Sequence, residues 1–465
     1  MTEWQLTVGL EIHVQLKTKT KMFCGCKNDP FHSEPNTNVC PVCYGLPGAL
    51  PTLNKRAIEL VVEFGQAIGA KISPETFWAR KNYFYPDLPK GYQISQSTEP
   101  LITGGVVSFE GRSYHLNHAH LEEDAGKLIH QSNEDFSLVD YNRAGTPLLE
   151  IVTEPDFHTA AEAKRFCQEL QRIMRHLEAS DADMEKGQMR CEANISVAPS
   201  NWQPATGEIA IGQRPEARSQ KLGTKVEVKN INSFRNVERA IEYEFARQTD
   251  VLEGGGKVEH ETRTWNDADG RTILMRSKET SADYRYFPEP DLPRVKIEVG
   301  TKKLSKLPEA QRAELEALGV SRGLAEIIVD KGWQQILLAL VGRNKQLVRE
   351  AATALTDYPN FAKLSLDNQE TLLKVRHEKG WTKVTFSQVI DDVLGGKSLD
   401  EAAVGDEFDL EQVVKDVIAA NAMVVNDFKA GKAPALNFLV GQVMAKTKGQ
   451  ANIQNVRKEL EGILK

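Results

Sequence analysis

The sequence predicts an α+β domain over residues 1–292, followed by an all-helical domain over residues 293–395 and a small helical tail over residues 396–465. Short runs of alternating apolar and polar residues, such as TVGLEIHVQL, dominate the first part and are typical of strands. Amphipathic segments with helical spacing lie between these runs, which favours a mixed α+β fold. After Pro293 the alternation ends and helical spacing continues towards the C-terminus.

Individual helices carry recognisable boundary residues. NKRAIELVVEFGQAIGA starts with Asn54, a residue that favours the N-cap position. TAAEAKRFCQELQRIMRHLE and FRNVERAIEYEFARQTDVL have clear amphipathic spacing. In LPEAQRAELEALGV, Pro308 suits a first helical turn and Gly319 ends the pattern. Gly395, Gly396 and the acidic stretch DEFDLEQ predict loops before the last helices.

Composition is that of an ordinary globular protein, with 40% hydrophobic and 26% charged residues. No apolar run approaches the roughly 18–20 residues that a membrane span needs. The N-terminal run contains Glu3 and Glu11, unlike a signal peptide, so we expect a cytoplasmic location and no membrane contact. The net charge of −7 argues against nucleic-acid affinity over the whole surface, so any RNA contact should be local.

Four cysteines have the spacing of a metal site. Cys24 and Cys26 are separated by thirteen residues from Cys40 and Cys43, and two such thiolate pairs can converge on a tetrahedral Zn²⁺ ion. Four sulfur ligands leave no open coordination position, so the predicted site is structural. The alternatives are unliganded thiols or a redox-active pair, and Cys-x-Cys is a less usual half-site than Cys-x-x-Cys.

Carboxylates and histidines gather in three early segments. Glu11 and His13 share one face of an alternating run, which suits either a metal ligand pair or a solvated strand face. HLNHAHLEEDAGK supplies a dense set, namely His115, His118, His120, Glu122, Glu123 and Asp124, and strand parity alone does not decide which glutamate faces inward. Glu150, between apolar neighbours, is costly to bury without a partner, and Mg²⁺ is one candidate.

No phosphate-binding loop is recognisable. The sequence GGKS at residues 395–398 fails the pattern because Asp391 stands where its first glycine should be. Further charged residues, Glu192 in RCEANISV and Glu227 and Lys229 in KVEVKN, extend the acidic set. Any use of ATP would therefore depend on metal-bound carboxylates and scattered basic residues. The residues by themselves indicate no more than a Mg²⁺-dependent enzyme.

The tail is locally basic although the whole chain is acidic. Between Phe428 and Lys458 there is no Asp or Glu. The basic residues of this stretch are Lys429, Lys432, Lys446, Lys448, Arg457 and Lys458. Contact with a phosphate backbone is the functional interpretation, and a solvated basic helix face is the alternative.

Several long motifs resemble those of the B subunits of tRNA-dependent amidotransferases. In chain order they are VGLEIHVQL, RKNYFYPDLPKGYQISQ, HLEEDAGK, DYNRAGTPLLEIVTEPD, MRCEANIS, EVKNINSF, DYRYFPEPDLP and ALNFLVGQVMAKTKGQAN. The resemblance spans essentially the whole chain. It implies a cradle-shaped α+β catalytic domain, a helical domain and a YqeY-like tail that binds tRNA.

The resemblance also implies an activity. Family members amidate glutamyl-tRNA(Gln), and often aspartyl-tRNA(Asn), by phosphorylating the side-chain carboxylate with ATP and displacing the phosphate with ammonia. An A subunit releases the ammonia from glutamine, and a small C subunit completes a heterotrimer. This sequence has no amidase signature of its own, so the ammonia should come from another chain. The alternatives are a non-catalytic tRNA-binding scaffold and a metal-dependent hydrolase.

Site residues follow from the same motifs. The resemblance implies Mg²⁺ ligands and catalytic residues at Glu11, His13, Glu123 and Glu150. It implies phosphate or substrate contacts at Arg80, Lys81, Asn82 and Glu192. The cysteine knuckle would hold structural Zn²⁺ at Cys24, Cys26, Cys40 and Cys43. The tail would contact tRNA through Lys429, Lys432, Lys446 and Lys448. The expected cofactors are ATP, Mg²⁺ and Zn²⁺.

Overall fold

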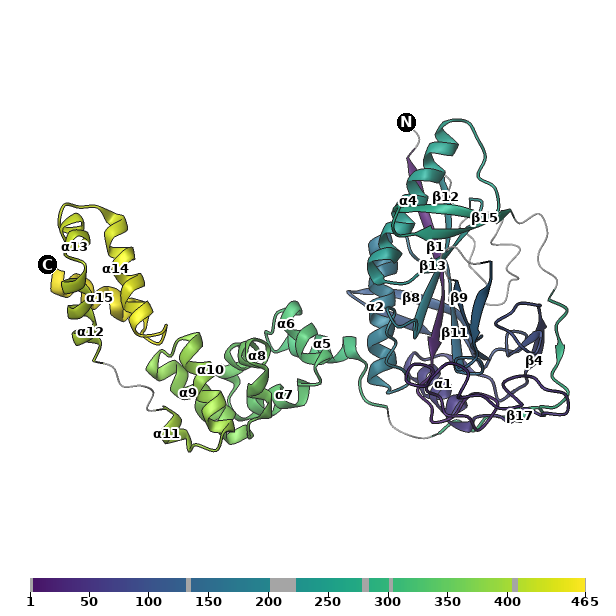
Figure 1. The fold of residues 1–465 in the computed structure, drawn as a ribbon, viewed down its shortest axis with the longest axis horizontal. Helices are drawn as coiled ribbons and strands as arrows, with labels where there is room; N and C mark the ends of the chain where they lie inside the picture. The colour runs from purple at the N-terminus through teal and green to yellow at the C-terminus, as the bar shows by residue number, and fades with distance from the viewer. Residues whose placement is uncertain are drawn as a thin grey trace. The chain divides into compact units, whose positions relative to one another are not determined.

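The computed structural model describes residues 3–130, 135–200, 223–277, 284–300, 304–403 and 409–464 (Figure 1). The chain forms two compact units, Met1–Pro308 and Glu309–Lys465. The first unit combines a large sheet with helices and the second is helical, which confirms the predicted fold class. Among the described residues, no helix combines the length and the apolar character of a membrane span. The domain boundaries at residues 292 and 395 stay predictions.

The main sheet of the first unit is built largely from antiparallel neighbours. Its strand order is β15-β14-β13-β12-β1-β11-β8-β5-β4-β16. The five central strands are β13 (Val226–Ile231), β12 (Met189–Pro199), β1 (Trp4–Gln15), β11 (Pro147–Thr153) and β8 (Arg112–Glu123). Towards the edges lie β15 (Arg271–Ser277), β14 (Glu261–Asn266), β5 (Tyr92–Ser95), β4 (Ala79–Asn82) and β16 (Phe287–Pro288). The pair β13–β14 is parallel.

Short strands complete the first unit. β2 (Lys71–Ile72), β6 (Ile102–Thr103) and β7 (Val106–Phe109) join the main sheet off its central path. Two separate pairs are β9 (Lys127–His130) with β10 (Ser137–Asp140), and β3 (Glu75–Thr76) with β17 (Val295–Lys296). The helices of this unit are α1 (Lys55–Ala67), α2 (Ala160–His176) and α4 (Phe234–Glu253).

One face of the central sheet is committed to the hydrophobic core. Along β1, Leu10, Ile12 and Val14 are buried and alternate with polar residues that point to the other face. Apolar side chains of α1, α2 and α4 belong to the same core cluster as these strand residues. Helices α2 and α4 pack against each other, and α4 also packs on β12 and β13 (Figure 1). The polar residues of five neighbouring strands consequently share the opposite face.

The predicted helix starts of the first unit are confirmed. Asn54 is the N-cap of α1 and its side chain accepts a hydrogen bond from the backbone N–H of Ala57. Thr159 caps α2, and Glu162 completes a reciprocal capping box. Both caps satisfy backbone donors that have no partner within the helix.

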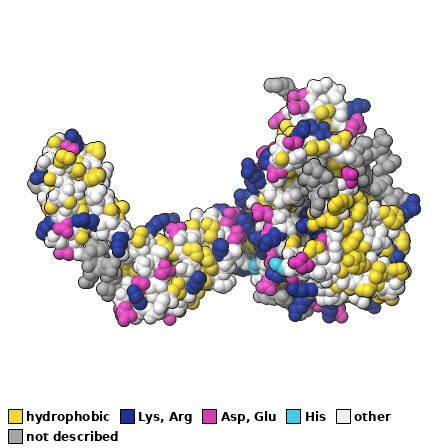
Figure 2. Space-filling model, viewed as in Figure 1, with side chains coloured by type: hydrophobic (Ala, Val, Ile, Leu, Met, Phe, Trp, Pro, Cys, Tyr) yellow, Lys and Arg dark blue, Asp and Glu magenta, His cyan; other side chains and the backbone are white. Residues whose placement is uncertain are grey.

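The second unit consists of short helices (Figure 1) that surround two apolar clusters. On the face seen in Figure 2, Lys, Arg, Asp and Glu side chains are scattered over this unit. Its first helices are α5 (Pro308–Ala317), α6 (Arg322–Asp330), α7 (Gln334–Arg343), α8 (Val348–Asp357), α9 (Leu366–Lys379), α10 (Lys383–Leu394) and α11 (Leu399–Ala403), with 3₁₀ turns at Lys345–Leu347 and Pro359–Lys363. The last are α12 (Leu410–Ala420), α13 (Ala422–Lys429), α14 (Ala433–Lys446) and α15 (Ile453–Leu464). The first cluster centres on residues such as Leu337, Leu355 and Phe386, and the second on Leu439 and Leu460.

Turn residues in this unit partly match the prediction. Pro308 begins α5, and Gly319 after it has a φ of 92°, a conformation that glycine adopts without strain. The acidic stretch DEFDLEQ was expected to be a loop throughout. Its residues 406–408 lie outside the described residues, but Asp409 caps α12 and Leu410 begins that helix, so the loop prediction is wrong from there on. Aspartate is a favoured N-cap residue, so Asp409 promotes the start of a helix at this point.

Candidate functional site

Charged side chains from five adjacent strands meet on the face of the sheet that is turned away from the core. They are Glu11 and His13 of β1, His118, His120 and Glu122 of β8, Glu150 of β11, Arg190 and Glu192 of β12, and Glu227 and Lys229 of β13. His13 lies opposite Glu150 in one strand pair and opposite Arg190 in the other. The sheet register therefore brings together residues that are far apart in the sequence.

A compact group forms around two histidines, and we call it the central group: Glu11, His13, His120, Glu122 and Glu150. Nε2 of His13 lies 3.3 Å from a carboxylate oxygen of Glu150, 3.7 Å from Glu122 and 4.0 Å from Glu11. Nε2 of His120 lies 3.5 Å from Glu150 and 3.8 Å from Glu122. The side chains of His13 and Glu150 are only 15% and 13% exposed, so these charges interact with little water between them.

Proton affinities in this group are displaced by the crowding. Burial, together with the charges of Glu150 and Glu192, raises the pKa of Glu11 to about 7. Burial opposes a charge on His13, yet contact with Glu150 raises the pKa of this imidazole to about 9. Burial would also raise the pKa of Glu150, but His120 and His13 hold it well below its usual range. Anions held this closely are stabilised by positive charge.

Three residues of the central group have ligand atoms close enough for one cation. Suitable atoms of Glu11, His13 and Glu150 all lie within 4.8 Å of one another. Carboxylate oxygens are the ligands that hard divalent cations prefer, and the histidine adds a nitrogen ligand. The three residues come from two neighbouring strands, so the sheet holds them without help from a loop. The predicted association of these three residues is confirmed as geometry, and their role stays a prediction.

Glu123, which was expected in this group, lies elsewhere. Neighbouring side chains of a strand point to opposite faces, so Glu122 and Glu123 cannot both face the group. The carboxylate of Glu123 forms an ion pair with Lys90 and accepts a hydrogen bond of 3.0 Å from the backbone N–H of Ile94. One carboxylate oxygen of Glu122, by contrast, has no hydrogen-bond partner within the described parts of the chain. The structure thus places Glu122, and not Glu123, beside His13 and His120, and the expected role of Glu123 stays a prediction.

A β-bulge in β8, which the sequence does not reveal, determines that Glu122 and not Glu123 faces the central group. The register of β8 with β11 shifts between Val152 and Thr153. Before the shift Leu116 faces the core, and after it Ala119 and Leu121 do. An uninterrupted alternation would count parity differently along β8, so the inward glutamate could not be identified from spacing alone.

Arg80 and Asn82 are occupied by structural contacts. The Nε and Nη2 atoms of Arg80 each donate a hydrogen bond of 2.7 Å to the carboxylate of Glu289. The guanidinium carbon lies 4.3 Å from the ring centre of Tyr92. The amide of Asn82 donates to the backbone carbonyl of Arg285 at 2.8 Å. These contacts attach the segment around β16 to β4. The expected contact of Arg80 and Asn82 with phosphate or substrate stays a prediction.

Lys81 differs from its two neighbours because it faces the acidic side chains. Its ammonium lies 5.1 Å from the ring centre of Tyr284. Burial disfavours its charge, but Glu122 and Glu150 raise the pKa of Lys81 above its usual value. A lysine that stays charged beside a cluster of carboxylates can also approach an anionic substrate there.

A second acidic cluster lies next to the central group and contains a lysine side chain. Ligand atoms of Glu11, Glu192 and Glu227 lie within 4.8 Å of one another. Lys229 forms ion pairs with Glu192 and, at 3.2 Å, with Glu227. Burial disfavours the charge of Lys229, while Glu192 and Glu227 raise its pKa. The structure thus places Glu192 beside the central group, opposite Glu11 in the β1–β12 register, and neutralises it with lysine.

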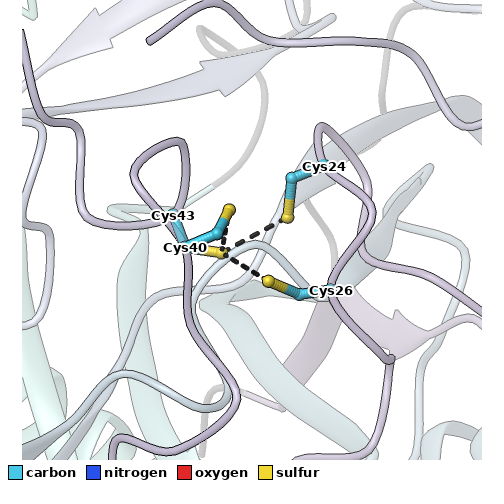
Figure 3. A group of neighbouring side chains, drawn as sticks. All are labelled: Cys24, Cys26, Cys40 and Cys43. Atoms are coloured by element: carbon cyan, nitrogen blue, oxygen red, sulfur yellow. Dashed lines mark hydrogen bonds between the residues drawn. The ribbon is translucent and has the colours of Figure 1, made fainter.

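The four cysteines of the predicted knuckle converge on Cys43 (Figure 3). Its sulfur lies 3.3 Å from that of Cys24 and 3.6 Å from those of Cys26 and Cys40. The ammonium of Lys21, also buried, lies 3.6 Å from the same sulfur. The hydrogen bond from Cys24 and the charge of Lys21 lower the pKa of the Cys43 thiol to about 4, although burial opposes this. These four thiols could hold a metal ion.

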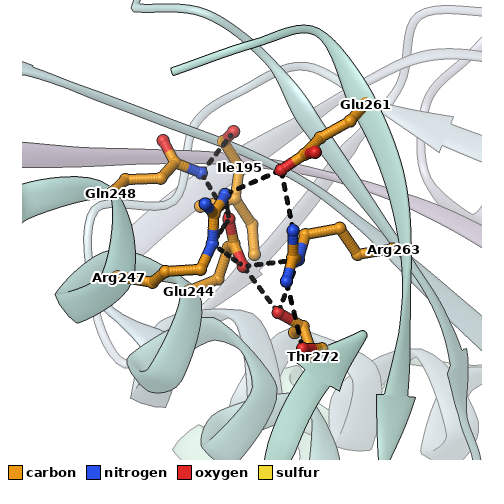
Figure 4. A network of polar contacts seen from close by, with 7 residues as sticks. All are labelled: Ile195, Glu244, Arg247, Gln248, Glu261, Arg263 and Thr272. Atoms are coloured by element: carbon orange, nitrogen blue, oxygen red, sulfur yellow. Dashed lines mark hydrogen bonds and ion pairs between the residues drawn. The ribbon is translucent and has the colours of Figure 1, made fainter. Parts of the chain in front are cut away.

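A separate set of buried charges is structural. Glu244 of α4 is fully buried and accepts hydrogen bonds from Arg247 and, at 3.0 Å, from Thr272 of β15 (Figure 4). Arg263 of β14 and Arg247 also share Glu261. Each charge has several partners, so the network ties α4 to the edge of the sheet.

The lysines predicted to contact tRNA lie at helix ends of the tail and are exposed. Lys429 ends α13, and Lys432 precedes α14 and pairs with Asp427 at 2.8 Å. Lys446 ends α14, and Lys448 follows it with a positive φ of 49°. Nucleic-acid contact stays a prediction for all four.

Comparisons with known proteins cover nearly the whole chain. A family model described as the GatB/GatE catalytic domain matches residues 6–303, and one described as a GatB domain matches residues 338–464. Relatives named as the B subunit of aspartyl/glutamyl-tRNA(Asn/Gln) amidotransferase include one from Persephonella marina, 40% identical with both chains covered completely. Those from Symbiobacterium thermophilum and Clostridium beijerinckii are 40% and 41% identical, over 98% of this chain and 97% and 98% of theirs.

The assignment of Glu122 can be tested against its neighbour. We expect Glu122→Gln to weaken Mg²⁺ binding at least about tenfold, because it removes a charged ligand from the central group. Glu123→Gln should leave Mg²⁺ affinity within a few-fold and lower the free energy of unfolding, because Lys90 loses its partner. Calorimetric Mg²⁺ titration and urea unfolding measure the two effects. The reverse pattern would restore Glu123 to the group.

The cysteine cluster predicts a bound metal ion that depends on each thiol. We expect Cys40→Ser to lose most of the bound metal and to lower thermal stability, because one of four ligands is replaced by a weaker one. Cys167→Ala, which alters a buried thiol next to Cys191 and outside the cluster, should keep the metal. Metal content measured by plasma mass spectrometry decides this, and equal metal content in both variants would contradict it.

Proposed function

The chain belongs to the GatB family, and we propose that it amidates the amino acid of misacylated tRNA with ATP. Its proposed substrates are glutamyl-tRNA(Gln) and aspartyl-tRNA(Asn), which the names of the relatives contain. The observation that carries the proposal is the central group, in which carboxylates and histidines from β1, β8 and β11 converge beside Lys81.

The chemistry explains why such a group is needed. A carboxylate is a poor acyl donor, because an oxide ion is a poor leaving group. In the proposed reaction a carboxylate oxygen attacks the γ-phosphorus of ATP, ADP leaves, and an acyl phosphate results. Ammonia then attacks the carbonyl carbon and inorganic phosphate leaves, which yields the amide. The first step joins two anions, so positive charge must lie between them.

The central group fits Mg²⁺, which Glu11, His13, Glu122 and Glu150 would hold. When bound, the ion would supply charge that neutralises phosphoryl and carboxylate oxygens. Lys81 of β4 adds a second positive charge near Glu122 and Glu150, and its ammonium is suited to bind a phosphoryl or carboxylate oxygen. The low exposure of Glu122 and Glu150 limits water near the reacting atoms, which protects a hydrolysable intermediate.

In the cysteine cluster we propose Zn²⁺ in a structural role. Four thiolates around one sulfur-lined position match its tetrahedral preference and leave no position for substrate. Backbone hydrogen bonds tie this knuckle to the start of α1, since Thr52 donates to Phe23 and Asn54 to Met22. The ion would therefore stabilise the loop that follows β1.

We further propose that ammonia comes from an A subunit, in a heterotrimer with a small C subunit, and that the tail binds tRNA. The relatives are named as one subunit of an amidotransferase, which supports an assembly of several subunits. The exposed lysines at the ends of α13 and α14 support the RNA contact.

Catalysis and tRNA binding should separate in one variant. In complex with its co-purified partner subunits, Glu150→Gln should lower tRNA-dependent ATP turnover at least about 100-fold, because the shared carboxylate of the central group loses its charge. The affinity for tRNA should stay within a few-fold. Glu154→Gln removes the same charge outside the central group, where it contacts Asn117, and should stay active. Normal turnover in Glu150→Gln would refute the assignment, and absent turnover in the wild type would favour a scaffold.

Loss of tail charge should act on RNA affinity alone. We expect Lys446→Gln/Lys448→Gln to weaken tRNA binding and to reduce its salt dependence by roughly 1 to 2 in the slope of log K against log salt, because two phosphate contacts are lost. The control Lys374→Gln/Lys415→Gln removes two lysines that are already paired with glutamates. Filter binding at several salt concentrations measures both. Equal slopes in the two double variants would place the RNA site elsewhere.

A further inference from the structure

A second set of metal ligands lies beside the central group. Ligand atoms of His118, His120 and Glu150 lie within 4.8 Å of one another. The two histidines are two residues apart on β8 and share a face, with ring centres 5.5 Å apart and planes inclined by 17°. The sheet register places His120 directly opposite Glu150. Two imidazoles and a carboxylate are therefore held by two paired strands.

His120 is buried without the hydrogen bonds that an imidazole needs. The residue is 1% exposed, and neither ring nitrogen has a hydrogen-bond partner among the residues that the structure describes. Its nearest anions, Glu150 at 3.5 Å and Glu122 at 3.8 Å, are beyond the usual hydrogen-bond distance. Since buried polar groups are rarely left unsatisfied, this ring points to a ligand that the chain itself does not supply.

His118 is oriented as a metal ligand commonly is. Its Nδ1 donates a hydrogen bond of 2.8 Å to the side-chain oxygen of Asn117. A hydrogen bond at one ring nitrogen fixes the tautomer and directs the other nitrogen to a metal.

We propose that His118, His120 and Glu150 bind a first-row transition-metal ion, adjacent to the carboxylate-rich site and sharing Glu150 with it. Imidazole favours ions such as Zn²⁺, Co²⁺ and Fe²⁺, whereas Mg²⁺ favours oxygen ligands. The histidine-rich site and the carboxylate-rich site thus favour different metal ions. Three protein ligands leave open positions for water or a substrate oxygen. The inference goes beyond the proposed amidation and concerns binding, so it is measured without turnover.

Co²⁺ is the probe, because its spectrum reports its ligands. The full-length protein, with the cysteine cluster loaded with Zn²⁺, is titrated with Co²⁺ in the presence of excess Mg²⁺. We expect one equivalent of Co²⁺ to bind with weak visible bands and without the intense near-ultraviolet band of cobalt thiolate. Complete displacement of Co²⁺ by Mg²⁺ would show a single shared site and overturn the proposal. An intense thiolate band would place the ion on the cysteines and would also overturn it.

A variant pair assigns the ligands. His118→Asn should weaken Co²⁺ binding at least about tenfold while circular dichroism stays unchanged. His115→Asn alters a histidine of the same strand that is paired with Asp156 and outside the set, and should bind Co²⁺ like the wild type. Wild-type affinity in a folded His118→Asn protein would refute the site. If that variant does not fold, the Mg²⁺ competition in the wild-type protein decides the question.

Discussion

Repulsion among carboxylates on one face of a sheet is the constraint around which the first unit is arranged. The core side of β1, β8 and β11 is apolar, so alternation forces the charged residues onto the other side. There burial and the nearby charges of Glu150 and Glu192 raise the pKa of Glu11. His13 and Lys81 relieve part of this repulsion, and a divalent cation would relieve more.

The surrounding charges keep this arrangement specific. Lys229 offsets part of the negative charge of Glu192 on β12 and Glu227 on β13. Lys90 holds Glu123 away from the central group, and the pairing of Arg80 with Glu289 fixes the strand that carries Lys81. Each of these pairs leaves the carboxylates of the central group available to an external cation. The proposed joining of phosphate and carboxylate depends on that availability.

The sequence predicts much of the fold and of the central group, and there are physical reasons why it does not predict the remaining contacts. Period-two alternation correctly placed Glu11 and His13 on one face, and the burial cost of Glu150 correctly predicted that its carboxylate has a partner. The resemblance implied Glu123, whereas the structure places Glu122 in the central group; strand parity could not decide between them, because a β-bulge changes the parity along β8 and single-sequence spacing does not show a bulge. The pairing of Arg80 joins residues more than 200 positions apart, which only the fold reveals.

Anomalous diffraction from crystals of the protein soaked with Mn²⁺ in place of Mg²⁺ tests the central claim most directly. Mn²⁺ accepts the same oxygen ligands and can be located without ambiguity. The account predicts an anomalous peak in contact with the carboxylates of Glu11, Glu122 and Glu150 and the imidazole of His13. A peak at Glu123, or no peak on this face of the sheet, would contradict it.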